Sequence, residues 1–148
     1  MNNNSLRSFL SLFVIAYAIS FMGNIFPRTS QAADADTTTK LQTVIAGSHR
    51  TEADKARDQY RHPLETLTWF GIKDNMTVVE LVPGGGWYTD ILAPFLKERG
   101  VYYAAGFDPE SEVEYMKKGA QRFKEKIDAN TEMLGKTHVT ILAPPNKT

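Results

Sequence analysis

The stretch from residue 77 to residue 88 constrains the fold of this chain more than any other. It begins with five mostly apolar residues that include the acid Glu80, and it continues through three consecutive glycines, Gly84–Gly86, into a helix-like segment. A strand, a glycine turn and a helix N-terminus in this order can hold an adenosyl or phosphate-bearing ligand, because glycines let the backbone approach a ligand closely. The stretch therefore predicts an α/β fold that binds a nucleotide-type ligand.

Helical and extended patterns alternate along the chain around this stretch. One helix is expected from Glu52 with Thr51 as its N-cap, and a second from Pro63 to Gly71. After the glycines, the pattern predicts a helix over 89–99, a strand over 101–107, an amphipathic helix spanning 113–127 and a strand over 139–142. Pro94 is expected to kink the first of these helices or to delay its start.

This alternation predicts the fold class. Strands that are apolar throughout and separated by helices are typical of parallel sheets, which helices cover. We expect an α/β protein with a three-layer Rossmann-like parallel sheet, of which only the first half, about three strands, is present.

The N-terminus has the pattern of a secretion signal. A short polar segment precedes an almost wholly apolar run over 9–26, and the small residues Ser30 and Ala32 suit a signal peptidase site. We therefore expect a signal peptide over 1–32, cleaved after Ala32 or Ala33, and a periplasmic or secreted protein with no stable membrane span after cleavage. An uncleaved membrane anchor is the alternative, because the apolar run has about the length of a minimal spanning helix. A flexible leader is expected over 33–50, and a partial Rossmann-like domain over 51–148.

Composition excludes several functional classes. The 17 basic and 17 acidic residues give a formal net charge of zero, which argues against binding of nucleic acid. There is no cysteine, so disulfides and thiol catalysis are excluded. His49 and His138 have no carboxylate or second histidine at metal-ligand spacing, and no metal site is expected.

The glycine turn departs from two common nucleotide motifs. In the dinucleotide fingerprint a third glycine follows three positions after the second, and counting from Gly84 and Gly86 that position holds Thr89. The phosphate-loop motif also fails, since no Gly-Lys-Ser/Thr follows. Glu80 stands four residues before Gly84, which makes the pattern acid-x-x-x-Gly-x-Gly.

That pattern, with Asp108 at the end of the next strand, resembles the class I S-adenosylmethionine-dependent methyltransferases. In that family the first strand ends in acid-x-Gly-x-Gly-x-Gly around the amino-acid part of the cofactor, and an acid after the second strand binds the ribose. The resemblance matches Glu80 to the first acid, Gly84 and Gly86 to the second and third glycines, and Asp108 to the ribose acid. Val82 occupies the first glycine position, where a β-branched residue cannot adopt positive φ without cost.

The resemblance is closer to a group of exported bacterial predicted methyltransferases. The segments that carry it are 57–63, 69–72, the Pro-Gly-Gly-Gly-Trp-Tyr turn over 83–88, the Ile-Leu-Ala-Pro segment 91–94 and the Ala-Ala-Gly-Phe-Asp-Pro segment 104–109. It covers roughly residues 50–145. Members of that group continue through a fourth strand, so the resemblance implies a C-terminally truncated chain.

The resemblance implies S-adenosylmethionine as a small-molecule cofactor and a set of residues that bind it. This set is Glu80, Gly84, Gly85, Gly86, Trp87, Tyr88 and Asp108. Structural roles remain open for several members: Glu80 as a cap or turn acceptor, Asp108 as a turn opener, and the two aromatic residues as core. His62 is more typical of a surface residue before a helix than of a base, so no catalytic residue is assigned.

The predicted function is therefore that of the cofactor-binding half of a methyltransferase with an unknown acceptor. The alternative is an inactive, truncated Rossmann-like fragment in the periplasm that binds nothing or only a partner chain. A dinucleotide-dependent oxidoreductase is a weaker third reading, against which Thr89 already counts.

Overall fold

The computed structural model describes residues 29–142, with side chains from residue 35 onward. Residues 1–28, which hold most of the predicted signal peptide, lie outside the described part. The chain divides into two compact units, 1–34 and 35–148. In the first unit the described backbone belongs to the start of a helix. None of the described helices is long and apolar enough to cross a membrane.

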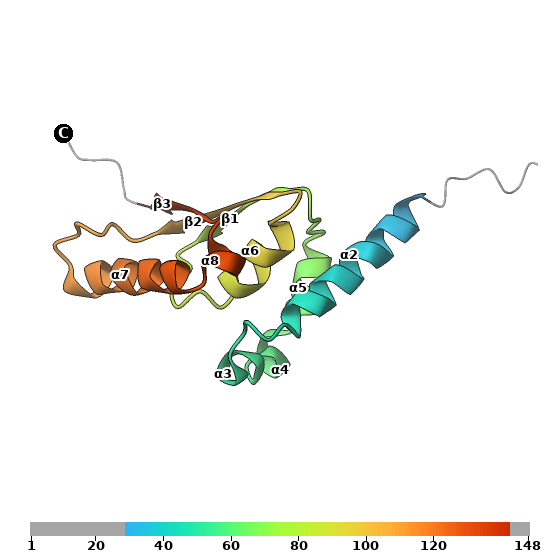
Figure 1. The fold of residues 1–148 in the computed structure, drawn as a ribbon, viewed down its shortest axis with the longest axis horizontal. Coiled ribbons are helices and arrows are strands. Elements are labelled where there is room, and N and C mark those ends of the chain that lie inside the picture. Colours follow the sequence, from blue (N-terminus) through green and yellow to red (C-terminus); the bar gives the residue numbers. More distant parts are fainter. Residues whose placement is uncertain (1–28, 143–148) are drawn as a thin grey trace, which may run out of the picture. The chain divides into compact units, whose positions relative to one another are not determined.

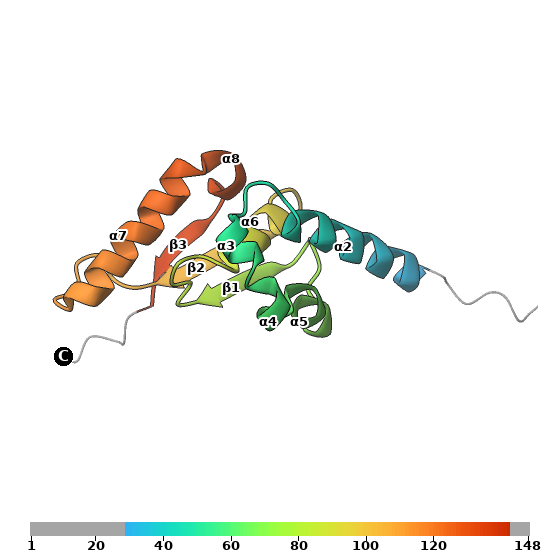
Figure 2. The same cartoon turned by 90° about the horizontal axis from the view of Figure 1, so that it is seen from below.

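The second unit is a mixed α/β fold with a three-stranded parallel sheet, which confirms the predicted α/β class and the predicted first half of a Rossmann-like sheet. The strands are β1 (Thr77–Leu81), β2 (Val101–Gly106) and β3 (His138–Ile141), and they pair in the order β1-β2-β3. Glu80 lies opposite Ala104 in the first pair, and Ala104 lies opposite Val139 in the second. Figures 1 and 2 show the strands side by side, with helices α6, α7 and α8 on one side of them.

Three short helices precede β1: α3 (Glu52–Lys55), α4 (Asp58–Arg61) and α5 (Pro63–Trp69). The Thr51 hydroxyl accepts a hydrogen bond from the Asp54 N–H at 3.1 Å, so the predicted N-cap is confirmed. Pro63 opens α5, and Gly71 follows its end with φ of 69°, as the sequence predicts.

The flexible leader predicted for residues 33–50 is instead largely helical. Helix α2 spans Thr29–Ile45, and Leu41 on it is completely buried in the main core with Leu67 and Phe95. The neighbouring Lys40 pairs with Asp74 at 2.9 Å. The prediction is wrong for residues 35–45. The residues before Leu41 are mostly small and polar, but Leu41, Val44 and Ile45 form a short apolar stripe that packs into the core.

Helix α6 (Thr89–Leu96) is buried along its whole length. It packs against β2 and α8 (Thr131–Leu134), and the core that surrounds it includes Leu41 of α2 and Leu67 of α5. The predicted helix ends three residues earlier than expected, and Pro94 lies inside it. Short helix α8 has no counterpart among the predicted elements.

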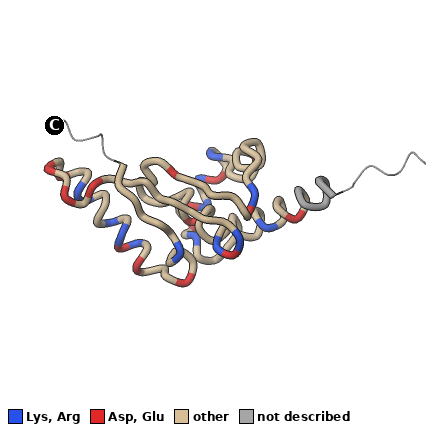
Figure 3. Tube along the Cα trace, turned by 90° about the horizontal axis from the view of Figure 1, so that it is seen from above, with Lys and Arg blue, Asp and Glu red and all other residues tan. Residues whose placement is uncertain are grey.

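Helix α7 (Glu114–Ala129) follows β2 and is only partly buried. Phe123 and Ile127 of its predicted apolar stripe are buried, whereas Val113 and Met116 at its start are exposed. Figure 3 marks both basic and acidic positions along the Cα trace of α7.

The two faces of the sheet differ in their covering. Tyr102 and Ala104 point to the face that α6 covers and are buried, whereas Val79, Leu81 and Val101 point to the opposite face. Val79 is 54% exposed and Leu81 is 65% exposed. Among the described residues, the helical layer therefore covers one face of the sheet.

The burial of Leu41 generates a first prediction. Leu41→Ala should lower the free energy of unfolding by about 2–5 kcal/mol, because it leaves a cavity in a packed core. Gln42→Ala, at the exposed neighbouring position, should change it by less than about 0.5 kcal/mol. Urea denaturation of both variants measures the difference, and equal stability of the two would contradict a structural role for α2.

Candidate functional site

The turn after β1 is built on an alternating left-handed backbone. Val82, Gly84 and Gly86 have φ of 54°, 57° and 78°, and the two residues between them do not take positive φ. The Val82 N–H donates to the Ala105 carbonyl at 2.8 Å, which ties the start of the turn to β2. The chain therefore reverses direction at the carboxyl ends of two neighbouring strands.

Val82 adopts its conformation against its intrinsic preference. A β-branched residue clashes with its own backbone at positive φ, and the following proline disfavours helical dihedrals further. Such a conformation costs on the order of 1–3 kcal/mol and persists only where the surroundings enforce it. The folded chain therefore carries the conformational cost that the sequence predicts for Val82 at positive φ.

Lys126 of α7 closes over the turn from one side. Its Nζ donates to the Gly85 carbonyl at 3.1 Å and to Asp90 Oδ2 at 2.6 Å. A Cβ added at Gly86 would lie 3.1 Å from Lys126 Cδ, so this glycine also permits close approach of the lysine stem. The sequence marks Lys126 only as one charge on a polar helix face, and nothing local reveals its partner.

Asp90 connects α6 to two other parts of the chain. Pro94 has no N–H to donate to the Asp90 carbonyl, and His49 Nε2 donates to that carbonyl instead, at 2.8 Å. Because a carbonyl oxygen only accepts, Nε2 carries the proton. Burial raises the pKa of the Asp90 carboxyl, while the Lys126 ammonium acts in the opposite direction.

Glu80 points under α6 rather than into the turn. Its Oε2 accepts hydrogen bonds from the Thr89 hydroxyl at 2.9 Å and from the Tyr102 hydroxyl, and those two hydroxyls lie 3.0 Å apart. Burial is the largest cause that raises the pKa of the Glu80 carboxyl, and the two hydroxyl donors lower it. Burial and the nearby Glu80 also raise the pKa of Tyr102. Thr89, where the dinucleotide motif requires glycine, thus has a structural role here.

Trp87 and Tyr88 turn towards the N-terminal helices. Trp87 is buried, and its indole N–H donates to the Asp54 carbonyl at 2.9 Å. The Arg61 guanidinium lies 4.7 Å from the centre of the Trp87 ring, and the Tyr88 ring meets it edge-on at 4.7 Å. This geometry favours the core role that the sequence left open for the two aromatic residues.

Arg50 is a buried charge that the sequence gives no local signal for. Its guanidinium makes two hydrogen bonds of 2.7 Å to the Asp58 carboxylate, donates to the Ile45 carbonyl and lies 5.3 Å from the Trp87 ring. Arg50 lies in the segment before α3 and Asp58 at the start of α4, eight residues apart, and no helix-surface pairing has this spacing. Arg50 therefore links the end of α2 and the start of α4 to Trp87.

Asp108 follows β2 at the same edge of the sheet as the glycine turn. Its Oδ1 accepts the Glu110 N–H at 2.8 Å, which is the turn-opening role expected of an Asp-Pro pair. Its other carboxylate oxygen has no hydrogen-bond partner among the described residues.

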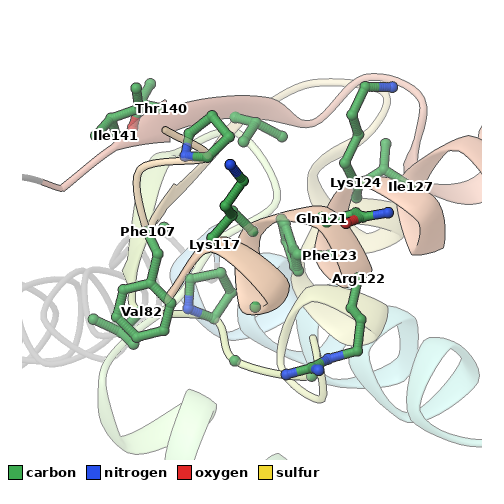
Figure 4. A pocket seen from close by; sticks show the side chains of 18 of the residues that line it. Val82, Phe107, Lys117, Gln121, Arg122, Phe123, Lys124, Ile127, Thr140 and Ile141 are labelled. Atoms are coloured by element: carbon green, nitrogen blue, oxygen red, sulfur yellow. The ribbon is translucent and has the colours of Figure 1, made fainter. Parts of the chain in front are cut away.

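A groove of about 950 Å³ opens beside the turn (Figure 4). Gly84 and Gly85 line it, together with Phe107 and Pro109 on either side of Asp108. Of the predicted set, Gly84 and Gly85 line this concave site, whereas the other five members are not lining residues: Glu80, Gly86, Trp87, Tyr88 and Asp108. No group of three His, Asp or Glu side chains in the described residues is placed to hold a metal ion.

Comparison with known proteins adds no assignment to this geometry. No family model matches the chain, and no match was found among curated proteins or among solved structures.

The buried Glu80 generates a prediction about pH. The folded state raises its pKa above the ordinary value of 4.5, so the proton-linked contribution to stability is complete below that value and is lost as the pH rises through the folded-state pKa. Glu80→Gln removes this dependence. Its unfolding free energy relative to wild type should therefore rise between about pH 4 and about pH 8.

Chemical denaturation across that pH range measures the change. Glu65→Gln, at an exposed carboxylate of α5, is the matched control and should follow the wild-type profile. A Glu80→Gln profile parallel to wild type would contradict the burial argument.

The strained turn generates a prediction about stability. Val82→Gly should raise the free energy of unfolding by about 1 kcal/mol, because relief of the left-handed strain exceeds the entropy cost of glycine. Val79→Gly, the same change in the regular part of β1, should lower it by about the same amount. Thermal melts of the two variants are expected to shift in opposite directions, and a loss of stability in both would argue against strain at Val82.

Proposed function

We propose that this chain binds S-adenosylmethionine and forms the cofactor-binding part of a methyltransferase. The observation that carries the proposal is the left-handed backbone at Val82, Gly84 and Gly86, directly after the first strand. These are the three positions at which the methyltransferase pattern has glycine. Even the valine takes the conformation that the pattern requires, which supports a turn of the same shape.

The position of the turn gives further support. Ligands of open α/β sheets bind outside the carboxyl ends of the strands, and the turn and Asp108 both follow carboxyl ends in a parallel pair. A Cβ added at Gly85 would meet no atom within 4 Å, so there is open space above the turn. Asp108 keeps one carboxylate oxygen available for a donor such as a ribose hydroxyl.

The residues divide into a binding group and a supporting group. Gly84 and Gly85 would hold the amino-acid part of the cofactor, and Asp108 its ribose. Glu80, Thr89 and Tyr102 form a buried network that orients the turn from below. The bound cofactor supplies an activated methyl group on a sulfonium, so the protein's part is orientation and exclusion of water. No general base is proposed.

The N-terminal pattern of residues 1–32 supports a periplasmic or secreted location for this function. The uncovered apolar face of the sheet favours a second candidate, an inactive chain that binds no cofactor. The two candidates differ in whether the turn binds S-adenosylmethionine at all.

Isothermal titration of the purified 148-residue chain with S-adenosylmethionine tests the proposal. We expect measurable binding at or below millimolar ligand. Gly85→Ala should weaken it by at least about tenfold without changing the melting temperature, because the added methyl projects only into the open space above the turn.

Gly84→Ala is the matched comparison, because it adds the same methyl at a residue with φ of 57°. It should lower both affinity and melting temperature. Absence of heat at millimolar S-adenosylmethionine for the folded wild-type chain would defeat the proposal.

A further inference from the structure

Arg61, the last residue of α4, lies close to both aromatic side chains that follow the glycine turn. Its guanidinium carbon is 4.7 Å from the centre of the Trp87 ring and 6.0 Å from the centre of the Tyr88 ring. The two rings meet edge-on, with an angle of 84° between their planes. A guanidinium next to aromatic rings keeps the N–H donors at its edge free for another partner. The rings therefore hold the Arg61 charge beside the turn without neutralising it.

The Arg61 guanidinium is exposed, and it has no hydrogen-bond or ion-pair partner in the part of the chain that the structure describes. Two other cations near the turn differ in this respect. The Arg50 guanidinium makes two hydrogen bonds to the Asp58 carboxylate. The Lys126 ammonium pairs with the Asp90 carboxylate at 2.6 Å. Of these three cations, Arg61 alone is left to bind an anion from outside the chain.

The backbone next to Arg61 has an unusual conformation. Among the described non-glycine residues, positive φ occurs at His62, with 44°, and at Val82, with 54°. His62 directly follows Arg61, and its N–H donates to the Asp58 carbonyl at 2.8 Å. Left-handed non-glycine residues persist where several contacts enforce them, and they cluster at binding sites. The end of α4 and the start of the glycine turn share this property.

We propose that Arg61 binds the amino-acid carboxylate of S-adenosylmethionine on the glycine turn. A carboxylate matches a guanidinium because two parallel N–H···O bonds can form between them. This inference rests on the proposed function, which places the amino-acid part of the cofactor at Gly84 and Gly85 and its ribose at Asp108. The carboxylate is then at the end of the ligand remote from Asp108, and Arg61 reaches the turn from the N-terminal helices.

The aromatic pair of the predicted set gains a role in this arrangement. Trp87 and Tyr88 act on the ligand through the cation that they hold, and their own rings remain in the core. A carboxylate of the methyl acceptor is another source of the same chemistry. The two sources give different results, because only the first changes the affinity for S-adenosylmethionine itself.

Isothermal titration of the full chain with S-adenosylmethionine and with decarboxylated S-adenosylmethionine tests the inference. The two probes share the adenosyl group, the sulfonium and the amine, and they differ only in the carboxylate. Wild type should bind S-adenosylmethionine at least about tenfold more tightly. Equal affinity for the two probes would overturn the inference and leave the proposed function standing. Absence of heat with both probes at millimolar concentration would defeat the proposed function and this inference with it.

Substitutions assign the effect to one side chain. Arg61→Gln should weaken binding of S-adenosylmethionine by about tenfold and should not weaken binding of the decarboxylated probe. Arg61→Lys keeps the charge without the planar fork, so it should retain part of the affinity. Arg57→Gln removes a half-exposed guanidinium that is paired with Asp54, and as the matched control it should bind both probes as wild type does.

Two results for Arg61→Gln would overturn the inference. Equal weakening of both probes would show that Arg61 only supports the structure. Unchanged affinity for S-adenosylmethionine would show that its carboxylate lies elsewhere, even if a carboxylate of the acceptor meets Arg61. The melting temperature of the ligand-free variant should stay close to that of wild type, because Arg61 is exposed.

Discussion

The ion pair between the buried Asp90 and the half-buried Lys126 joins the parts of this fold that local structure does not connect. Asp90 stands in the first turn of α6, and Lys126 reaches it from α7 while also donating to the Gly85 carbonyl. On its other side, the Asp90 carbonyl accepts a hydrogen bond from His49, which brings in the segment after α2. Removing Lys126 would leave the buried Asp90 carboxylate without its ion-pair partner, which is destabilising. Loss of either partner would therefore disturb the glycine turn, α6 and α7 together.

The same constraint explains how the turn tolerates its strain. Val82 is held by its hydrogen bond to Ala105, and Gly86 donates to the Pro83 carbonyl at 2.8 Å. Lys126 and the Glu80 network then fix the turn from two sides. A left-handed valine persists only when several independent contacts determine its conformation, and such sites cluster where ligands bind. The strain is thus an observation in favour of a binding role, and it does not depend on any comparison with other proteins.

The two faces of the sheet differ in how far helices cover them. On one face α6 is completely buried, yet only Phe123 and Ile127 of α7 are buried, and the groove beside α7 is open. On the other face Val79 and Leu81 remain exposed among the described residues. The groove is lined by charged as well as apolar side chains, and the exposed face carries the stacked pair Tyr103 and His138 beside its apolar residues.

Much of the fold follows from local sequence. The bounds of β1, the Thr51 cap, the opening of α5 at Pro63 and the parallel α/β arrangement were all predictable, because propensity, capping and strand–helix alternation act between near neighbours. Helix α2 was not predictable. Its buried Leu41 stands among small polar residues, and only a core built from distant elements buries it.

The candidate site divides in the same way. The sequence by itself determined that a glycine turn follows a strand ending near an acid, since glycine and apolar runs carry that information locally. Only the tertiary structure decided that Glu80 turns under α6, that Trp87 packs on Arg50 and Arg61, and that Lys117 and Arg122 line a groove. Side-chain direction and pairing depend on which distant segments the sheet brings together, and no spacing along the chain encodes that choice.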